Sequence, residues 1–442
     1  MTNRAIVILV ALAVAIFLLT QTFYTVDPTK QVLVRQFGAI VGSPKTEPGL
    51  YAKVPLIQDI QKFWSQNMRK YYGRRFRFVP KNRILGATGQ SSLNRLPCPE
   101  GLSWRTDVKD NAIGGECSTG YIVVWDATPA GILARIARNY GQAPVGMVFA
   151  HEFGHVVQAQ LDINQSTIHM EQQADCFGGA YVAWNVQHGA VKLISSPGDI
   201  DQLFRGMLLV RDDPGTSAGD SGAHGSGFDR VRAFQDGYLR GIAACRAYRH
   251  KLPPLFETAF TANDIGTGGN LPYDQLLSDV TPAVNKYFTQ TEPGFTDVTL
   301  ADPAAVPPAD GTCSTVIPLT TVCPATRTVY FDTAAVRSQH TNVGDAATAA
   351  LLALTAADSA VPADVPAASR YLWDACRAGN FFRTEAAAGQ LSAGDMDEVL
   401  SFLLHPAATI QPGDYARAAL ALRRGVFGGR DSCPAFIANP GI

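Results

Sequence analysis

Two histidines and a glutamate occur at the spacing of a metal-binding helix in the apolar stretch 148–157. His151 and His155 are four residues apart, so a helix places both imidazoles on one face, one above the other. This arrangement suits a zinc ion, which takes histidine nitrogens at about 2.0–2.1 Å. Glu152 can accept the proton of a water molecule that the metal polarises. The pattern His-Glu-x-x-His therefore predicts a zinc site, although a buried helix with two hydrogen-bonded histidines is the alternative.

A third ligand is predicted on the next helical segment, residues 170–181. Glu171 and Asp175 are again four residues apart, so both project from one helix face. Glu171 can bind the zinc, and Asp175 can orient a ligand imidazole through its second ring nitrogen. A surface helix with salt bridges would also contain these acids, but the segment continues into residues typical of a packed helix. Glu-x-x-x-Asp after His-Glu-x-x-His is the gluzincin arrangement, with three protein ligands and one open position for water.

A glycine-rich loop, residues 215–227, follows these segments and contains His224. The loop lacks the Gly-Lys-Ser/Thr ending of a phosphate-binding loop, and no predicted strand leads into it. His224 can face the zinc and donate a hydrogen bond to the oxygen that becomes negative when a peptide carbonyl is attacked. The alternative is a mobile loop without a chemical role.

Together these motifs resemble the neutral zinc metallopeptidases of bacteria. The likeness covers about residues 63–250 and rests on the segments 151–158 and 171–179, on Phe63-Trp64 and Trp125-Asp126, and on the segments 224–226 and 229–234. The resemblance implies His151, His155 and Glu171 as ligands of one zinc ion. It also implies Glu152 as the general base in the hydrolysis of peptide bonds.

The chain begins with an apolar run, residues 5–20, preceded by one arginine. The run is at the short end for a spanning helix, and the neutral and aromatic residues up to Val26 extend it. We predict a transmembrane anchor over residues 1–25. A cleaved signal peptide is the alternative, but no small-x-small cleavage site follows the run. The predicted location is membrane-anchored and extracytoplasmic, or secreted if the segment is cleaved.

Residues 26–62 resemble the start of a stomatin/prohibitin-type (SPFH) membrane protein. The segment 26–38 alternates like a strand, and Pro48-Gly49 supplies a turn before a second strand. The resemblance ends near residue 62, far short of a complete domain of that family. It therefore predicts only a stalk, and an SPFH-type membrane scaffold is the least favoured class of function.

The composition indicates a globular, loop-rich protein of 442 residues with room for two or three domains. A formal net charge of −1 gives no electrostatic footprint for nucleic acid. The basic and aromatic stretch 69–78 is therefore interpreted as a strand with one polar and one apolar face. The predicted partners are a peptide or protein substrate and, through the anchor, the membrane; no nucleic acid is expected.

The region after residue 286 repeats the first half without its chemistry. The matching segments are 287–290 with 63–66, 329–332 with 123–126, 344–346 with 141–143, 373–379 with 174–179, and 395–400 with 199–204. In this register the positions of His151, Glu152, His155 and Glu171 are taken by Leu354, Thr355, Asp358 and Tyr371. We predict a degenerate, metal-free copy, and a shared alanine-rich composition is the alternative.

Eight cysteines, none in a Cys-x-x-Cys pair, fit disulfides in a chain that leaves the cytosol. Many complete pairings are possible, but matching the two halves selects one set: Cys98–Cys117 with Cys313–Cys323, and Cys176–Cys245 with Cys376–Cys433. Free buried cysteines in a reducing compartment are the alternative.

The predicted fold is α+β and predominantly helical. It comprises the anchor (1–25), the stalk (26–62), a gluzincin-like zinc metallopeptidase domain (63–285) and the degenerate repeat (286–442). The predicted function is hydrolysis of peptide bonds by zinc-activated water with Glu152 as general base. The leading alternative is an extracytoplasmic binding or scaffold protein with a structural zinc. A structural site usually has four protein ligands, however, and only three good candidates are present.

Overall fold

The computed structural model describes four short strands before residue 55 and then residues 55–98, 100–190, 192–256, 258–262, 264, 266–315, 317–405 and 410–438. The predicted anchor lies almost entirely outside the described residues, as does most of the predicted stalk. No helix within the described part of the chain is long and apolar enough to cross a membrane. Strand β1 (Phe23–Val26) pairs antiparallel with β4 (Gly49–Ala52), and β2 (Arg35–Gln36) pairs antiparallel with β3 (Ala39–Ile40).

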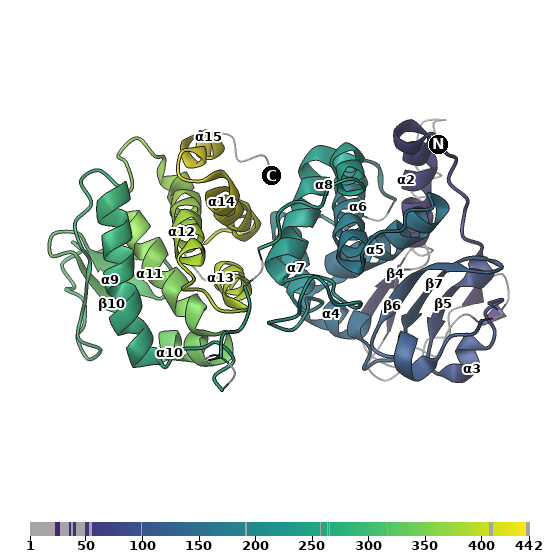
Figure 1. Ribbon diagram of the computed structural model, residues 1–442, viewed down its shortest axis with the longest axis horizontal. Coiled ribbons are helices and arrows are strands. Elements are labelled where there is room, and N and C mark those ends of the chain that lie inside the picture. The colour runs from purple at the N-terminus through teal and green to yellow at the C-terminus, as the bar shows by residue number, and fades with distance from the viewer. Residues whose placement is uncertain are drawn as a thin grey trace, which may run out of the picture. The chain divides into compact units, whose positions relative to one another are not determined.

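The described chain is mostly helical with some sheet, which confirms the predicted α+β class (Figure 1). The elements from residue 55 to residue 248 are α2 (Pro55–Tyr72), η1 (Lys81–Arg83), β5 (Ile84–Ala87), α3 (Gln90–Leu93), η2 (Trp104–Val108), β6 (Ala112–Cys117), β7 (Gly120–Asp126), α4 (Ile132–Tyr140), α5 (Gln142–Gln160), α6 (Thr167–His188), α7 (Pro197–Leu208) and α8 (Gly227–Tyr248). Those that follow are α9 (Tyr273–Thr291), β8 (Thr299–Leu300), β9 (Thr320–Cys323), β10 (Thr328–Phe331), α10 (Thr333–Asn342), α11 (Asp345–Ser359), η3 (Ala367–Ser369), α12 (Arg370–Ala387), α13 (Asp395–Leu403), α14 (Asp414–Gly428) and α15 (Ser432–Ala438).

The chain divides into two compact units, and both α5 and α6 contribute to each of them. One unit comprises residues 1–135, 148–163 and 181–193, and the other comprises residues 136–147, 164–180 and 194–442. The first unit contains the sheet β5-β7-β6, whose apolar side chains form a core around Ile122 and Val124. The second contains the sheet β8-β10-β9 and a helical core in which α12 packs against α11 and α14 (Figure 1).

The two three-stranded sheets have the same topology. In each, the central strand pairs in parallel with the strand that comes first in the chain and antiparallel with the strand just before it. The helices also occur in the same order along the chain. Helix α2 precedes the first sheet and α4 to α8 follow it, just as α9 precedes the second sheet and α10 to α14 follow it. His151 is the tenth residue of α5, and Leu354 is the tenth residue of α11.

Close helix contacts recur at corresponding places in the two series of helices, α2 to α8 and α9 to α14. A Cβ atom on Gly179 of α6 would lie 2.0 Å from the carbonyl oxygen of Phe234, and one on Gly379 of α12 would lie 2.2 Å from that of Leu422. Each position therefore requires a residue without a side chain. In both series the chain also bends at a glycine with positive φ, four residues before a disulfide cysteine: Gly241 (φ 67°) and Gly429 (φ 70°).

The strand predicted over residues 69–78 is wrong, because helix α2 continues through the first part of this stretch and ends at Tyr72. The buried side chains of Ile60, Trp64 and Met68 recur every fourth residue, so a helical apolar stripe prevails over the local alternation. Gly73, with φ +73°, ends the helix by donating its N–H to the carbonyl of Arg69. No strand follows within residues 73–80.

Candidate metal centre

Helices α5 and α6 carry the predicted ligands, and both are buried along most of their length. Gly141, in the left-handed conformation, separates α5 from the helix before it. The side chains of Phe149, Phe153 and Val157 then anchor α5 in the core at helical spacing. Because α5 is regular from residue 142 to residue 160, the residues four apart share a face, as the sequence predicts.

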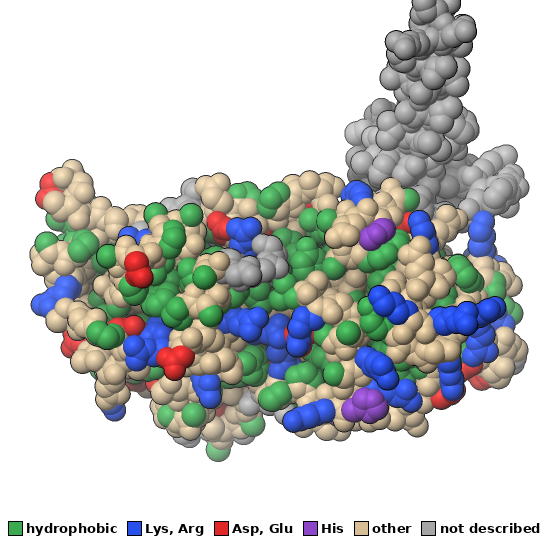
Figure 2. All heavy atoms as spheres, turned by 90° about the horizontal axis from the view of Figure 1, so that it is seen from above, with side chains coloured by type: hydrophobic (Ala, Val, Ile, Leu, Met, Phe, Trp, Pro, Cys, Tyr) green, Lys and Arg blue, Asp and Glu red, His purple; other side chains and the backbone are tan. Residues whose placement is uncertain are grey.

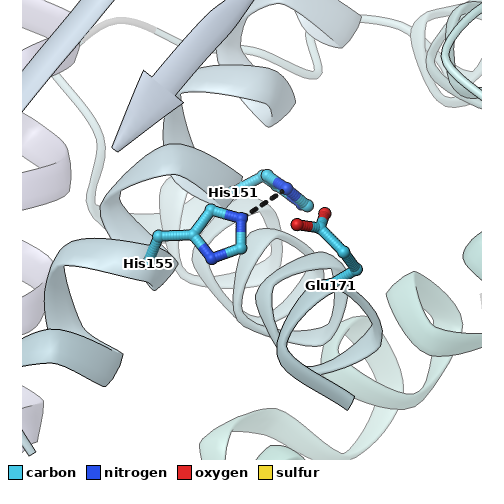
Figure 3. A group of neighbouring side chains, drawn as sticks. All are labelled: His151, His155 and Glu171. Carbon is cyan, nitrogen blue, oxygen red and sulfur yellow. Dashed lines mark hydrogen bonds between the residues drawn. The ribbon is translucent and has the colours of Figure 1, made fainter. Parts of the chain in front are cut away.

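The structure brings His151, His155 and Glu171 together, and Figure 3 shows their side chains pointing toward one another. One ligand atom from each of the three residues can be chosen so that all lie within 4.8 Å of one another. The Nε2 atoms of the two histidines are 3.1 Å apart. Two nitrogens on one tetrahedral zinc would be about 3.3 Å apart, given bonds of about 2.0–2.1 Å. Two imidazoles and a carboxylate are also donors that zinc prefers, so these residues fit the ion.

His155 has a buried partner that fixes its orientation. The side-chain oxygen of Gln158 lies 2.8 Å from Nδ1 of His155, and Gln158 is fully buried. If Nδ1 donates its proton to this oxygen, Nε2 is left with the lone pair that a metal requires. Sequence reasoning assigned Gln158 no such role. The available signal was a polar residue three positions after His155, on the same side of an otherwise apolar helix.

Glu152 lies on α5 beside strand β6, which forms one edge of the sheet β5-β7-β6. The contact is close, because a Cβ atom on Gly114 of β6 would lie 1.8 Å from the carbonyl oxygen of Glu152. Glu152 itself is buried, with 6% of its surface exposed. The glycine thus brings the edge strand directly against the backbone of the predicted general base.

Asp175 forms a buried ion pair with Arg230 of α8. Its two carboxylate oxygens accept hydrogen bonds from Nε and Nη2 of Arg230, at 2.8 and 2.9 Å. Both side chains are almost fully buried, which makes this a strong bidentate interaction. The predicted role of Asp175, orienting a ligand imidazole, stays a prediction. The ion pair instead links the helix that carries Glu171 to α8.

His224 is held by Asp212, a residue that sequence reasoning missed. One carboxylate oxygen of Asp212 accepts the backbone N–H groups of His224 and Gly225, both at 2.7 Å, and the other lies 3.2 Å from Nδ1 of His224. The hydrogen bond that the His224 ring donates to Asp212 raises the pKa of His224, and the charge of Glu171 raises it further. No motif links residues 212 and 224, so their pairing depends on the loop conformation.

The loop that carries His224 docks on α6 next to a predicted ligand. Gln172, which follows Glu171, donates a side-chain hydrogen bond to the carbonyl oxygen of His224 at 3.2 Å. Gly225 allows this approach, because a Cβ atom there would lie 2.6 Å from Nε2 of Gln172. The His224 side chain is half-exposed. It is not one of the three residues in the metal group, and its predicted role toward a substrate oxygen stays a prediction.

All four predicted disulfides are present: Cys98–Cys117, Cys176–Cys245, Cys313–Cys323 and Cys376–Cys433. The bond between Cys176 and Cys245 joins α6 to α8 little more than one turn after Glu171. It therefore restrains the same pair of helices as the ion pair of Asp175. Four disulfides indicate an oxidising, extracytoplasmic environment.

A second group of acids lies elsewhere in the described chain. Carboxylate oxygens of Asp345, Asp395 and Glu398 lie within 4.8 Å of one another. Burial raises the pKa of Asp395 and of Glu398 to about 8, so both side chains hold protons at neutral pH. The three side chains also accept backbone N–H groups, from Leu271, Ser392 and Ala346 respectively. Protons and backbone donors thus account for this group without a cation.

The chain is similar to two curated proteins over part of its length. The chain is 29% identical over 126 residues to the uncharacterized protein YpfJ of Escherichia coli strain K12, and equally to its counterpart in strain O6:H1. Each match covers 24% of this chain and 42% of the relative, so the chain spans less than half the length of these curated relatives. No family model matches, and no solved structure matches.

Proposed function

We propose that this protein is a zinc metallopeptidase of the gluzincin type. The observation that carries the proposal is the group formed by His151, His155 and Glu171, whose donor types and separations fit one zinc ion. Three protein ligands leave a fourth position for water, whereas structural zinc sites are usually closed by four. Bound zinc would lower the pKa of a water molecule and polarise a substrate carbonyl.

The residues of the chain supply the remaining chemistry. Glu152 accepts the proton of the attacking water and returns it to the leaving amine. Gln158 keeps Nε2 of His155 free of its proton. His224, held by Asp212, donates a hydrogen bond to the carbonyl oxygen as negative charge develops on it. The raised pKa of His224 supports this last role, because a larger fraction of the side chain is protonated near neutral pH.

A peptide is the proposed substrate because of the strand next to Glu152. Within the described part of the chain β6 is an edge strand, and an extended peptide can pair with the free edge of a sheet through main-chain hydrogen bonds. On the face drawn in Figure 2, basic side chains lie among apolar, neutral and acidic ones, and the net charge of the chain is −1. These features favour a peptide over a nucleic acid as substrate.

We also infer that residues 286–442 are a degenerate copy of residues 63–285. The support is the shared sheet topology, the shared order of helices, the paired disulfides and the matching glycine contacts. At the positions of the zinc ligands this copy has Leu354, Asp358 and Tyr371. Asp358 forms an ion pair with Arg370, so its carboxylate is already neutralised.

Zinc content and casein hydrolysis of the wild type and of Glu152→Gln test the proposal. We expect about one zinc per chain in both proteins. The substitution should lower kcat by about 10³-fold or more, because the amide cannot accept a proton. Equal zinc content with equal residual hydrolysis in both proteins would instead support the binding or scaffold alternative with a structural zinc. A wild type that retains no zinc would refute both interpretations.

A further inference from the structure

One carboxylate, that of Asp397 on α13, holds both ends of the segment that carries His224. Its Oδ2 accepts the backbone N–H of Gly227 at 2.9 Å, and its Oδ1 accepts that of Phe228 at 2.8 Å. Nε of Arg211 lies 3.2 Å from Oδ2. Arg211 directly precedes Asp212, and Gly227 comes three residues after His224. Asp397 therefore fixes the start and the end of the loop that positions His224.

The surroundings make this a strong restraint. Asp397 is 4% exposed, and hydrogen bonds to a buried, charged acceptor are about twice as strong as those between neutral groups. The carboxylate also lies at the N-terminus of α8, where the helix leaves N–H groups unpaired and its dipole favours negative charge. Removing the charge should therefore loosen the start of α8 together with the loop before it.

The loop also packs directly on the beginning of α13. A Cβ atom on Gly394 would lie 3.1 Å from the ring of Pro214, so the two segments are in close contact. Between the loop and α13 there is a cavity of about 50 Å³, to which Gly394, Met396 and Asp397 contribute. A space of this size has room for several water molecules. The loop thus contacts the start of α13 through Pro214, and the cavity lies beside this contact.

A mirrored contact provides an internal control. Asp201 on α7 accepts the backbone N–H groups of Gly413 and Ala416, at 2.6 and 2.8 Å, where α14 begins. Like Asp397 it is almost fully buried, with 2% of its surface exposed. Each half of the sequence therefore caps a helix of the other half. The helix capped by Asp201 contributes no residue to the group of His151, His155 and Glu171.

We propose that Asp397 is a positioning residue for the metal site, supplied by the half of the chain that has lost the zinc ligands. It acts through the segment 211–228, which it holds so that His224 stays paired with Asp212 and docked on Gln172. The catalytic consequence rests on the proposed peptidase function. The placement of His224 does not depend on that function, and it can be measured separately.

The experiment compares Asp397→Asn with Asp201→Asn in the full chain. Both variants should unfold a few degrees below the wild type, because each loses a buried cap. We expect kcat to fall about ten- to hundredfold in Asp397→Asn with little change in KM, since a displacement of about 1 Å can cost this much. Asp201→Asn should retain kcat within about twofold, as distant sites act independently. In a His224→Ala background, Asp397→Asn should cause no further loss of kcat.

Histidine-selective NMR of the protein gives the readout that does not need activity. The ring signals of His224, identified by their loss in His224→Ala, should shift in Asp397→Asn and stay in place in Asp201→Asn. Equal shifts, or none, in both variants would overturn the proposal. If Asp397→Asn fails to fold, Arg211→Gln is the milder variant and should move the same signals by less. A wild type that is no more active than Glu152→Gln would refute the peptidase function while the NMR result still decides the role of Asp397.

Discussion

Helices α5 and α6 differ from α11 and α12 in their chemistry but share a common framework. The first pair has His151, His155 and Glu171 in one group, whereas the second pair has Leu354, Asp358 and Tyr371 at the corresponding positions. Both α6 and α12 keep a glycine pressed against another helix and a cysteine bonded to a distant segment. On the proposal that residues 286–442 are a degenerate copy, the two halves share these packing and disulfide requirements but not the metal ligands.

The comparison separates the residues that helix packing requires from those that metal binding requires. A Cβ atom at either glycine would lie only about 2 Å from a carbonyl oxygen of the neighbouring helix. Neither glycine can therefore be replaced without moving a helix. A ligand position can change more easily, because removing the metal also removes the requirement for its donors. In the second copy, Leu354 has only 1% of its surface exposed and contributes to the core. In the proposed register, a buried leucine thus stands where α5 has a proposed ligand histidine.

The largest effect should come from giving α5 the residue of α11. His151→Leu removes one of the three proposed ligands, so we expect no stoichiometric zinc and hydrolysis no higher than that of Glu152→Gln. Elemental analysis of the purified chain measures the metal. Leu354→Met is the matched control, because it nearly conserves volume in the second copy and should leave zinc and activity unchanged. Retention of zinc by His151→Leu would contradict the ligand assignment.

The sequence predicts the local part of the metal site because helix geometry alone brings residues four apart onto one face. His151 with His155 is of this kind, and both lie where a regular helix places them. The disulfides were predictable for a different reason: the internal repeat narrows the possible pairings to one matched set.

The remainder of the site could not be predicted, because it depends on tertiary contacts without a sequence motif. Asp397 and Gly227 are 170 residues apart, and nothing in the spacing of either segment indicates their contact. Asp212 meets His224 only because the intervening loop folds back. The strand expected over residues 69–78 was wrong because a long-range apolar stripe, not the local alternation, decides the conformation of α2.

Two buried aspartates extend the comparison to stability. Asp175 of α6 is paired with Arg230, whereas neither carboxylate oxygen of the fully buried Asp374 of α12 has a hydrogen-bond partner among the described residues. We expect Asp175→Asn to cost about 3–5 kcal/mol in the free energy of unfolding, because it leaves a buried arginine uncompensated. Asp374→Asn should instead stabilise the chain by about 1–2 kcal/mol at pH 7, since it removes a buried carboxyl group that must take up a proton when the chain folds.

The pH dependence distinguishes the stabilisation by Asp374→Asn from a packing effect. Burial raises the pKa of Asp374 well above its ordinary value, so the folded state holds a proton that the unfolded state loses above about pH 4. Wild-type stability therefore decreases as the pH rises above this value, and the asparagine variant lacks that decrease. Its advantage should vanish below about pH 4. Denaturant unfolding of the metal-free, oxidised proteins at both pH values provides the measurement, and an advantage that does not change with pH would contradict this explanation.

The smallest effect on hydrolysis should come from His224, which is not one of the three residues in the metal group. His224→Ala removes one donor to the carbonyl oxygen, so kcat should fall about 10²-fold while zinc content is unchanged. Asp212→Asn tests the same role through pH. Because the hydrogen bond that His224 donates to Asp212 raises the pKa of His224, its loss lowers that pKa, and the protonated donor disappears at a lower pH. In Asp212→Asn, the decrease of kcat/KM on the basic side of the pH profile should therefore begin at a lower pH. In His224→Ala, the part of that decrease that comes from His224 should be absent. A basic limb that is identical in all three proteins would show that protonated His224 takes no part in the reaction.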